Sequence, residues 1–74
     1  MRPVRVELDG MRPVRLAWKR MWLTITAIAD HWWETGRWWE AETACEFVLA
    51  DTREGTFLLC RNSETREWYG KPVQ

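Results

Sequence analysis

The chain has 74 residues, seven of them tryptophan, and its 11 Lys and Arg residues balance 11 Asp and Glu residues. A chain of this length forms one domain at most and buries only about 60% of the surface that it exposes when unfolded. We therefore expect part of the tryptophan surface to stay accessible. Hydrophobic residues make up 46% and charged residues 30%, which is typical of a globular chain and not of a disordered one. No apolar run approaches the roughly 20 residues of a membrane-spanning helix, and no leader is visible, so we expect a cytoplasmic protein without membrane contact.

Charge and cysteine content exclude several kinds of site. Residues 1–20 carry six basic and two acidic groups, whereas residues 21–74 carry five basic and nine acidic groups. The N-terminal part is therefore basic although the whole chain is neutral. Cys45 and Cys60 are the two cysteines, and His31 is the one histidine, which is too few ligands for a four-ligand zinc site without carboxylates. We expect two buried, reduced thiols, with a disulfide or a metal bound by this pair as the alternative, and no metal or cofactor otherwise.

The first twenty residues contain a repeat, in which residues 1–5 recur as residues 11–15 with Asp9-Gly10 between them. Apolar residues alternate with charged ones on both sides, which predicts two strands, and Asp-Gly is a strong hairpin turn signal. The apolar positions are Val4, Val6 and Leu8 in the first strand and Val14, Leu16 and Trp18 in the second.

Lys19-Arg20 predicts a second tight connection, and the longest apolar stretch follows it over residues 21–33. Its first half alternates with period two and is rich in β-branched residues, which favours a strand. The phase slips after Thr26, so we expect a β-bulge or a short helical turn within residues 26–31. One amphipathic helix over residues 21–33 is the alternative.

Residues 32–39 are almost a palindrome, and folding them about Thr35-Gly36 predicts a hairpin. Its cross-strand pairs would be Glu34 with Arg37, Trp33 with Trp38, and Trp32 with Trp39. Adjacent strand residues point to opposite faces of a sheet, so one tryptophan pair would face the core and the other a partner. Thr-Gly is a weaker turn signal than Asn-Gly, which leaves a longer loop open.

Three further alternating segments follow, separated by polar turns at residues 51–55 and 62–65. The total is about six short antiparallel strands with turn signals every 8–12 residues, a spacing typical of small barrels. The sequence thus predicts one all-β domain over residues 2–72, folded as a small SH3-like barrel or curved roll. We expect Trp18, Trp68 and one tryptophan of each doublet in its core.

Two blocks, Gly36-Arg37-Trp38-Trp39-Glu40 and Thr65-Arg66-Glu67-Trp68-Tyr69, carry a family resemblance that covers residues 2–72. The chain resembles a small uncharacterised bacterial all-β domain family. It is also similar to the C-terminal segment of catalytically impaired Y-family DNA polymerase homologues of the bacterial translesion (mutagenesis) machinery. The chain departs from this pattern at Cys45 and Cys60 and has fewer arginines over residues 22–28. The resemblance implies an accessory, partner-binding role and no reaction.

An enzymatic function would have to use Asp30, His31 and Cys45. Neighbouring residues of a strand point apart, so Asp30 and His31 do not face each other. Nucleophilic catalysis by a Cys–His pair needs contact between the two side chains and a set of oxyanion donors, which nothing in the spacing supplies. We therefore expect a protein that is not an enzyme.

A protein-interaction module is the main functional prediction, because small barrels with exposed aromatic grooves bind extended or proline-rich segments. The resemblance implies a polymerase or mutagenesis complex as the partner, and a homodimer through the same surface is an alternative. The residues expected to bind the partner are Trp22, Trp33, Arg37, Trp38 and Tyr69.

Binding of single-stranded DNA is the second functional prediction, because it requires exposed aromatic rings beside a basic groove. The basic residues expected to form that groove are Arg5, Arg12, Arg15, Lys19 and Arg20. The zero net charge and the acidic remainder of the chain weigh against this function. The alternative is that these side chains are the solvated outer positions of two strands.

Overall fold

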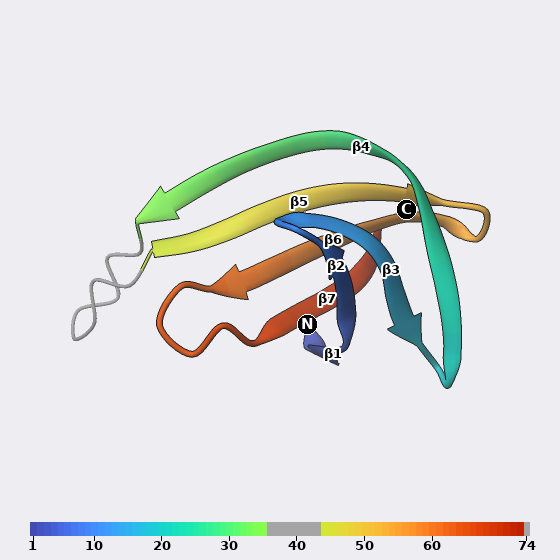
Figure 1. The fold of residues 1–74 in the computed structure, drawn as a ribbon, viewed down its shortest axis with the longest axis horizontal. Helices are drawn as coiled ribbons and strands as arrows, with labels where there is room; N and C mark the ends of the chain where they lie inside the picture. The colour runs from blue at the N-terminus through green and yellow to red at the C-terminus, as the bar shows by residue number, and fades with distance from the viewer. Residues whose placement is uncertain (36–43, 74) are drawn as a thin grey trace.

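The computed structural model describes residues 1–35 and 44–73. Within these ranges the chain is all-β, with seven strands and no helix, so the predicted fold class is confirmed. The strands are β1 (Arg2–Val4), β2 (Val6–Asp9), β3 (Arg12–Trp18), β4 (Met21–Thr35), β5 (Ala44–Thr52), β6 (Gly55–Asn62) and β7 (Trp68–Val73). They form one antiparallel sheet that curls into a half-barrel (Figure 1).

The sheet has the strand order β1-β7-β6-β5-β4-β3-β2. The strands β1 and β2 therefore lie at opposite edges, although only Arg5 separates them in the chain. The Ala17 amide donates a hydrogen bond of 2.8 Å to the Arg5 carbonyl, which holds this crossing segment against β3. The prediction of one unbroken first strand is wrong, because the chain leaves one edge of the sheet at Arg5 and joins the other.

The long strand β4 contains the predicted irregularity as two β-bulges, one between Ile25 and Ala27 and one between Ile28 and Asp30. The alternative of a helix over residues 21–33 is wrong. Residues 21–24 pair with β3, and residues 25–35 pair with β5. Bulges increase the local bend and twist of a strand, and β4 arches over the molecule between its two partners (Figure 1).

The first hairpin forms where it is predicted, but its register differs. Asp9 pairs with Arg12, so the two turn residues are Gly10 and Met11, and Gly10 takes a φ of +67° that glycine adopts without strain. Val14 is an extra residue, because Leu8 pairs with Pro13 and Glu7 with Arg15. This bulge places Pro13 in a buried position where the alternation predicted Val14.

The predicted two-residue turn at Thr35-Gly36 is wrong, because Thr35 pairs with Ala44; this fits the longer connection that the weak Thr-Gly signal left open. Trp32 lies opposite Phe47, and Trp33 lies opposite Glu46. The palindrome misled the prediction because β5 supplies the partners from further along the chain. Arg37, Trp38 and Trp39 lie outside the described residues.

The core is small and lies on the concave face of the sheet. Its buried hydrophobic members are Leu16, Leu23, Val48, Ala50, Phe57, Leu59 and Trp68. Trp68 is in the core as predicted, and Trp18 is half-buried, with its ring 5.3 Å from that of Phe57 in an edge-to-face contact. Trp22 and Trp33 are 48% and 52% exposed, which confirms that a core of this size leaves tryptophan surface accessible.

Glycine at position 70 permits close packing where β1 and β6 flank β7. A Cβ atom there would lie 2.9 Å from Leu59 Cδ2 and 3.4 Å from Val4 Cγ2. Gly70 pairs with both Arg2 and Leu59, so this close packing fixes β1 over the core at the edge of the sheet.

Replacing Lys19-Arg20 by Asn-Gly is expected to stabilise the fold by about 1 kcal/mol. Trp18 pairs with Met21, so these two residues form a two-residue turn, with φ of 49° at Lys19 and 68° at Arg20. This conformation is costly for long side chains and favourable for Asn-Gly. Urea denaturation measures the change. The double variant Lys19→Gln/Arg20→Gln removes the charges but keeps the backbone cost, so equal stability of the two variants would contradict the explanation.

Candidate functional site

A groove of about 740 Å³ lies at the seam where the chain crosses from β1 to β2. One side is formed by residues 3–7 of the crossing segment, and the other by residues 66–69, which lead into β7. Arg15 of β3 and Trp22 of β4 complete the lining. The groove exists because the two edges of the curled sheet approach each other without pairing directly.

Four of the predicted binding residues meet in this groove. Trp22 and Tyr69 come from the set predicted for a protein partner, and Arg5 and Arg15 come from the set predicted for DNA. Arg5 and Tyr69 are 64 positions apart in the chain, so it is the curl of the sheet that brings these residues together. Sequence reasoning did not select Arg66 as a binding residue, although it belongs to one of the two blocks that carry the family resemblance.

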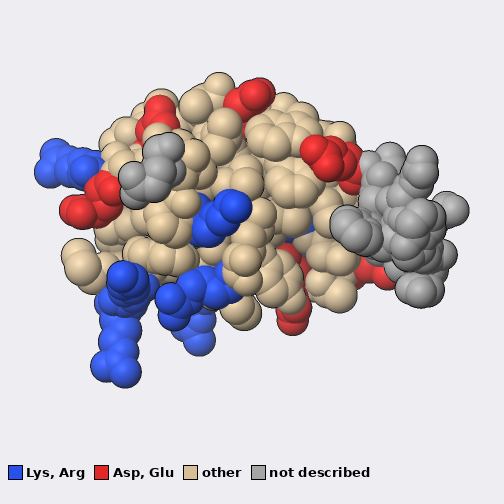
Figure 2. Space-filling view, turned by 180° about the vertical axis from the view of Figure 1, so that it is seen from behind, with Lys and Arg blue, Asp and Glu red and all other residues tan. Residues whose placement is uncertain are grey.

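The remaining predicted residues are elsewhere. Trp33 and Arg12 line a second groove, Lys19 and Arg20 form the β3–β4 turn, and Arg37 and Trp38 lie outside the described residues. Lys and Arg side chains gather at the end of the molecule where β3 turns into β4, at the lower left of Figure 2. The predicted basic set is therefore not one continuous binding track.

Two of the residues in the seam groove are held in place by neighbours. Arg15 forms an ion pair with Glu7, which raises the pKa of the guanidinium, and its Cζ atom lies 5.2 Å from the centre of the Trp22 ring. The Tyr69 hydroxyl donates to Glu67 over 3.1 Å, and this hydrogen bond to a carboxylate raises the tyrosine pKa. Both aromatic side chains therefore present a preorganised surface.

Arg5 and Arg66 differ from Arg15, because neither forms an ion pair with any residue in the described ranges. Both are exposed. Arg66 has a φ of +63°, and its amide donates to the Asn62 carbonyl over 2.7 Å. A non-glycine residue in this backbone region is uncommon and is often associated with a functional constraint. The aromatic groove is thus bordered by two arginine side chains that have no ion-pair partner in the described ranges.

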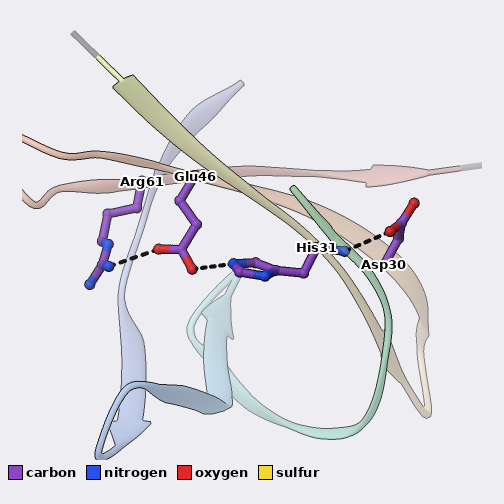
Figure 3. Close-up of polar contacts among 4 residues, drawn as sticks. All are labelled: Asp30, His31, Glu46 and Arg61. Carbon is purple, nitrogen blue, oxygen red and sulfur yellow. Dashed lines mark hydrogen bonds and ion pairs between the residues drawn. The ribbon is translucent and has the colours of Figure 1, made fainter. Parts of the chain in front are cut away.

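A buried carboxylate on the concave face forms a second polar constellation (Figure 3). Glu46 of β5 is only 7% exposed. Its Oε2 atom lies 2.6 Å from His31 Nε2, and its Oε1 atom lies 2.8 Å from Arg61 Nη2. A carboxylate only accepts hydrogen bonds, so His31 Nε2 carries the proton. These three residues connect β4, β5 and β6, with Glu46 buried and His31 at the surface.

The expectation that Asp30 and His31 point apart is confirmed by the same constellation. Asp30 accepts a hydrogen bond of 2.8 Å from the His31 backbone amide, whereas the His31 ring reaches Glu46 on the other side of the strand (Figure 3). Cys45 precedes Glu46 in β5 and lies on the opposite face of the sheet. These residues therefore do not form a nucleophile and base pair.

The two thiols are free and only half-buried, so the expectation of buried cysteines is wrong. They lie on the convex face in neighbouring strands, together with an aromatic pair. Burial and the adjacent Cys45 thiol raise the pKa of Cys60 to about 11. Trp32 stacks on Phe47 with 5.4 Å between the ring centres, and its indole donates to Glu34 over 2.9 Å. The first tryptophan doublet is therefore split between the two faces, as strand alternation predicts. Neither Trp32 nor Trp33 belongs to the core, so the expectation of a core tryptophan from this doublet is wrong, because the concave face opposite it carries the buried Glu46 instead of a hydrophobic residue.

Across residues 1–35 and 44–73, no three or more His, Cys, Asp or Glu side chains are grouped as metal ligands would be. The same part of the chain contains no helix with the length and apolar character needed to cross a membrane. Comparison with known proteins finds no matching family model, no matching curated protein and no matching solved structure.

Glu46→Gln is expected to destabilise the fold by about 2–3 kcal/mol, at or below the lower end of the range for breaking a buried ion pair, because His31 is partly exposed. The substitution keeps the side-chain shape and removes the charge that Arg61 and His31 share. Glu7→Gln is the matched control, since it breaks an exposed ion pair with Arg15 and is expected to cost less than about 1 kcal/mol. Urea denaturation of both variants measures the two losses, and similar losses would contradict a structural role of the buried charge.

Cys60 is expected to react slowly with iodoacetamide in the folded protein at pH 8. Raising the pKa from 9.0 to about 11 lowers the reactive thiolate fraction by about 100-fold. The folded state holds this proton more tightly, so the contribution of Cys60 to stability is complete below pH 9 and is lost as the pH rises through 11. Peptide mapping of the alkylated protein measures the rate, with protein unfolded in urea as the control. Equal rates in the folded and unfolded protein at pH 8 would show that the fold does not hold the thiol protonated.

Proposed function

We propose that this chain is a non-enzymatic interaction module whose seam groove, lined by residues 3–7, 15, 22 and 66–69, binds an extended segment of a protein partner. The observation that carries the proposal is the meeting of Trp22, Tyr69, Arg5 and Arg15 in one groove. Trp, Tyr and Arg are the residues that most often dominate the binding energy of protein interfaces. An aromatic groove suits the preformed extended conformation of a proline-rich segment.

The charges in the groove select among partner segments. Glu7 and Glu67 are engaged by Arg15 and Tyr69, whereas Arg5 and Arg66 have no acidic partner in the described ranges. A ligand that brings carboxylates beside its proline-rich centre would supply those partners, and a basic ligand would place its cations beside the two arginines. We therefore propose a proline-rich segment with acidic flanks as the ligand.

An accessory role in DNA repair and translesion synthesis, in the cytoplasm, is the biological setting that we propose for this module. Its support is the resemblance to the C-terminal segment of the Y-family polymerase homologues. Tyr69 and Arg66 of the seam groove belong to one of the two blocks that carry that resemblance. A polymerase or another component of the mutagenesis complex would then contain the bound segment.

Binding of single-stranded DNA is the second candidate, favoured by the cations of Arg5 and Arg15 beside the rings of Trp22 and Tyr69. The two glutamates in the same groove disfavour a phosphate backbone, and Arg12, Lys19 and Arg20 lie outside it. We rank this function below peptide binding for that reason.

A titration of tryptophan fluorescence with three probes tests the proposal. The probes are a peptide with a proline-rich centre flanked by glutamates, the same peptide flanked by lysines, and oligo-dT. We expect the glutamate-flanked peptide to bind most tightly, and Trp22→Ala to weaken that binding by at least tenfold, which corresponds to about 1.4 kcal/mol. Trp22 is half exposed, so this variant should keep a melting temperature near that of the wild type.

Trp33→Ala is the matched control, because Trp33 is equally exposed but lies in another groove. Unchanged peptide affinity in Trp22→Ala, or loss of affinity in Trp33→Ala alone, would reject the seam groove as the site. Quenching by oligo-dT that falls steeply with salt, without binding of either peptide, would establish the DNA-binding alternative instead.

A further inference from the structure

Among the described residues, no strand pairs with the outer edge of β4 beyond Thr24. β3 pairs with β4 only as far as Thr24, and beyond that point β5 is the one described strand that pairs with residues 25–35. In Figure 1 the two strands meet at the turn on the lower right and then separate, with β4 arching away from β3. Two bulges interrupt this edge before Asp30, and its regular part, residues 30–35, is as long as a typical strand of five or six residues, so it offers a template for another strand.

The space between the separated strands is a groove of about 620 Å³. Met11 of the β2–β3 turn, with Arg12 and Pro13 at the start of β3, forms one wall, and Ile28 and Trp33 of β4 form the other. Among the described residues of this lining, Arg12 is the one Lys or Arg, and it lies on the wall opposite the β4 edge. Val48 and the buried Glu46 line it from β5. Met11 is 80% exposed and Trp33 is 52% exposed, so apolar surface is available directly beside the unpaired edge.

Backbone hydrogen bonding shows which peptide groups face this edge. The His31 amide donates to the side chain of Asp30 and so does not point at β5. Antiparallel strands alternate between residues that bond to the neighbour and residues that point away from it. Trp33, two residues further along, therefore also directs its amide and carbonyl outward, whereas the groups of Trp32 and Glu34 point toward β5.

The charge of this edge determines what would pair with it. Residues 25–35 contain Asp30 and Glu34 and no Lys or Arg, and both carboxylates lie on exposed residues. A second copy pairing through the same edge would bring these carboxylates toward their own counterparts, and like charges opposite each other destabilise a strand pair. A basic segment would meet them with opposite charge.

We propose that the outer edge of β4 over residues 25–35 is a second docking site, which takes an extended partner segment of alternating apolar and basic residues as an added strand. The apolar side chains of the segment enter the groove between Met11 and Trp33, and its basic side chains face Asp30 and Glu34. Backbone hydrogen bonds at Trp33 supply affinity, and the groove and the carboxylates supply specificity. This site is separate from the seam groove and does not depend on the function proposed for it.

Amide hydrogen exchange followed by NMR tests the proposal with a probe peptide of alternating valine and lysine. We expect the Trp33 amide to exchange fast in the free protein and to slow at least tenfold when the peptide is added. The amides of Trp32 and Glu34 are internal controls, because they pair with β5 and should be protected in both states. A Trp33 amide that is already protected in the free protein, or that the bound peptide does not slow, would overturn the added strand.

Variants separate this site from its alternatives. Trp33→Ala is expected to weaken binding of the valine-lysine peptide at least tenfold, and the double variant Asp30→Asn/Glu34→Gln severalfold, whereas Trp22→Ala should leave it unchanged. A peptide of valine and glutamate should bind weakly. Equal binding of the two peptides would overturn the charge argument, and loss of binding in Trp22→Ala would reassign the peptide to the seam groove. Concentration-dependent dimerisation that slows the Trp33 amide without peptide would make a second copy the occupant instead.

Discussion

The structure depends on one crossing of the chain, in which Arg5 carries it from β1 at one edge of the sheet to β2 at the other. A sheet of short strands buries little surface if it stays flat, so curling is what gives this chain a core. The pairing of Val4 with Trp68 and the hydrogen bond from Ala17 to Arg5 hold the two ends of this crossing at opposite edges of the sheet. The same closure creates the seam groove, so core and candidate site have a common physical origin.

On the other side of the molecule, the length of β4 leaves an open sheet edge instead of a closed one. The strand spans both halves of the curled sheet, because its two bulges let it pair first with β3 and then with β5. Where β3 leaves, no described strand replaces it, and Glu46 lies beneath the opened edge with His31 and Arg61 as its partners. A buried charge of this kind is weak evidence for stability. We interpret the contacts of Glu46 with His31 and Arg61 as fixing the register of β4, β5 and β6 relative to one another.

Much of the fold follows from local sequence patterns. The alternation of apolar residues and the turn signals at Asp9-Gly10 and Lys19-Arg20 predict the strands and their connections. The alternation of apolar and polar residues breaks after Thr26, and this break predicts a bulge because a regular strand would continue the alternation. The pairing of residues 32–35 could not be predicted in the same way. A near-palindrome favours local pairing, yet β5 is the neighbour of β4, and no local pattern reports a partner further along the chain.

The candidate site was predicted in pieces but not as a unit. Exposed tryptophan and tyrosine were expected from the limited core, and Trp22 and Tyr69 were selected for a partner while Arg5 and Arg15 were selected for DNA. Their shared groove follows from closure between two sheet edges, which is a tertiary feature. Glu46 was missed because a charged residue within an alternating strand is ordinarily assigned to the solvent side, and its partners come from two other strands.

Hydrogen exchange at the amides of Val4 and Ala17 together is the most direct test of the closure on which the seam groove depends, because Val4 pairs with Trp68 at one edge of the sheet and Ala17 bonds to Arg5 at the other. Only Arg5 separates β1 from β2, so in a closed half-barrel both amides should exchange more slowly than an unprotected amide, with the fully buried Leu59 in the middle of the sheet as the reference. Exchange of Val4 at the rate of an unprotected amide, with Ala17 and Leu59 still protected, would show a β2–β3 hairpin without closure of the sheet and would contradict the account.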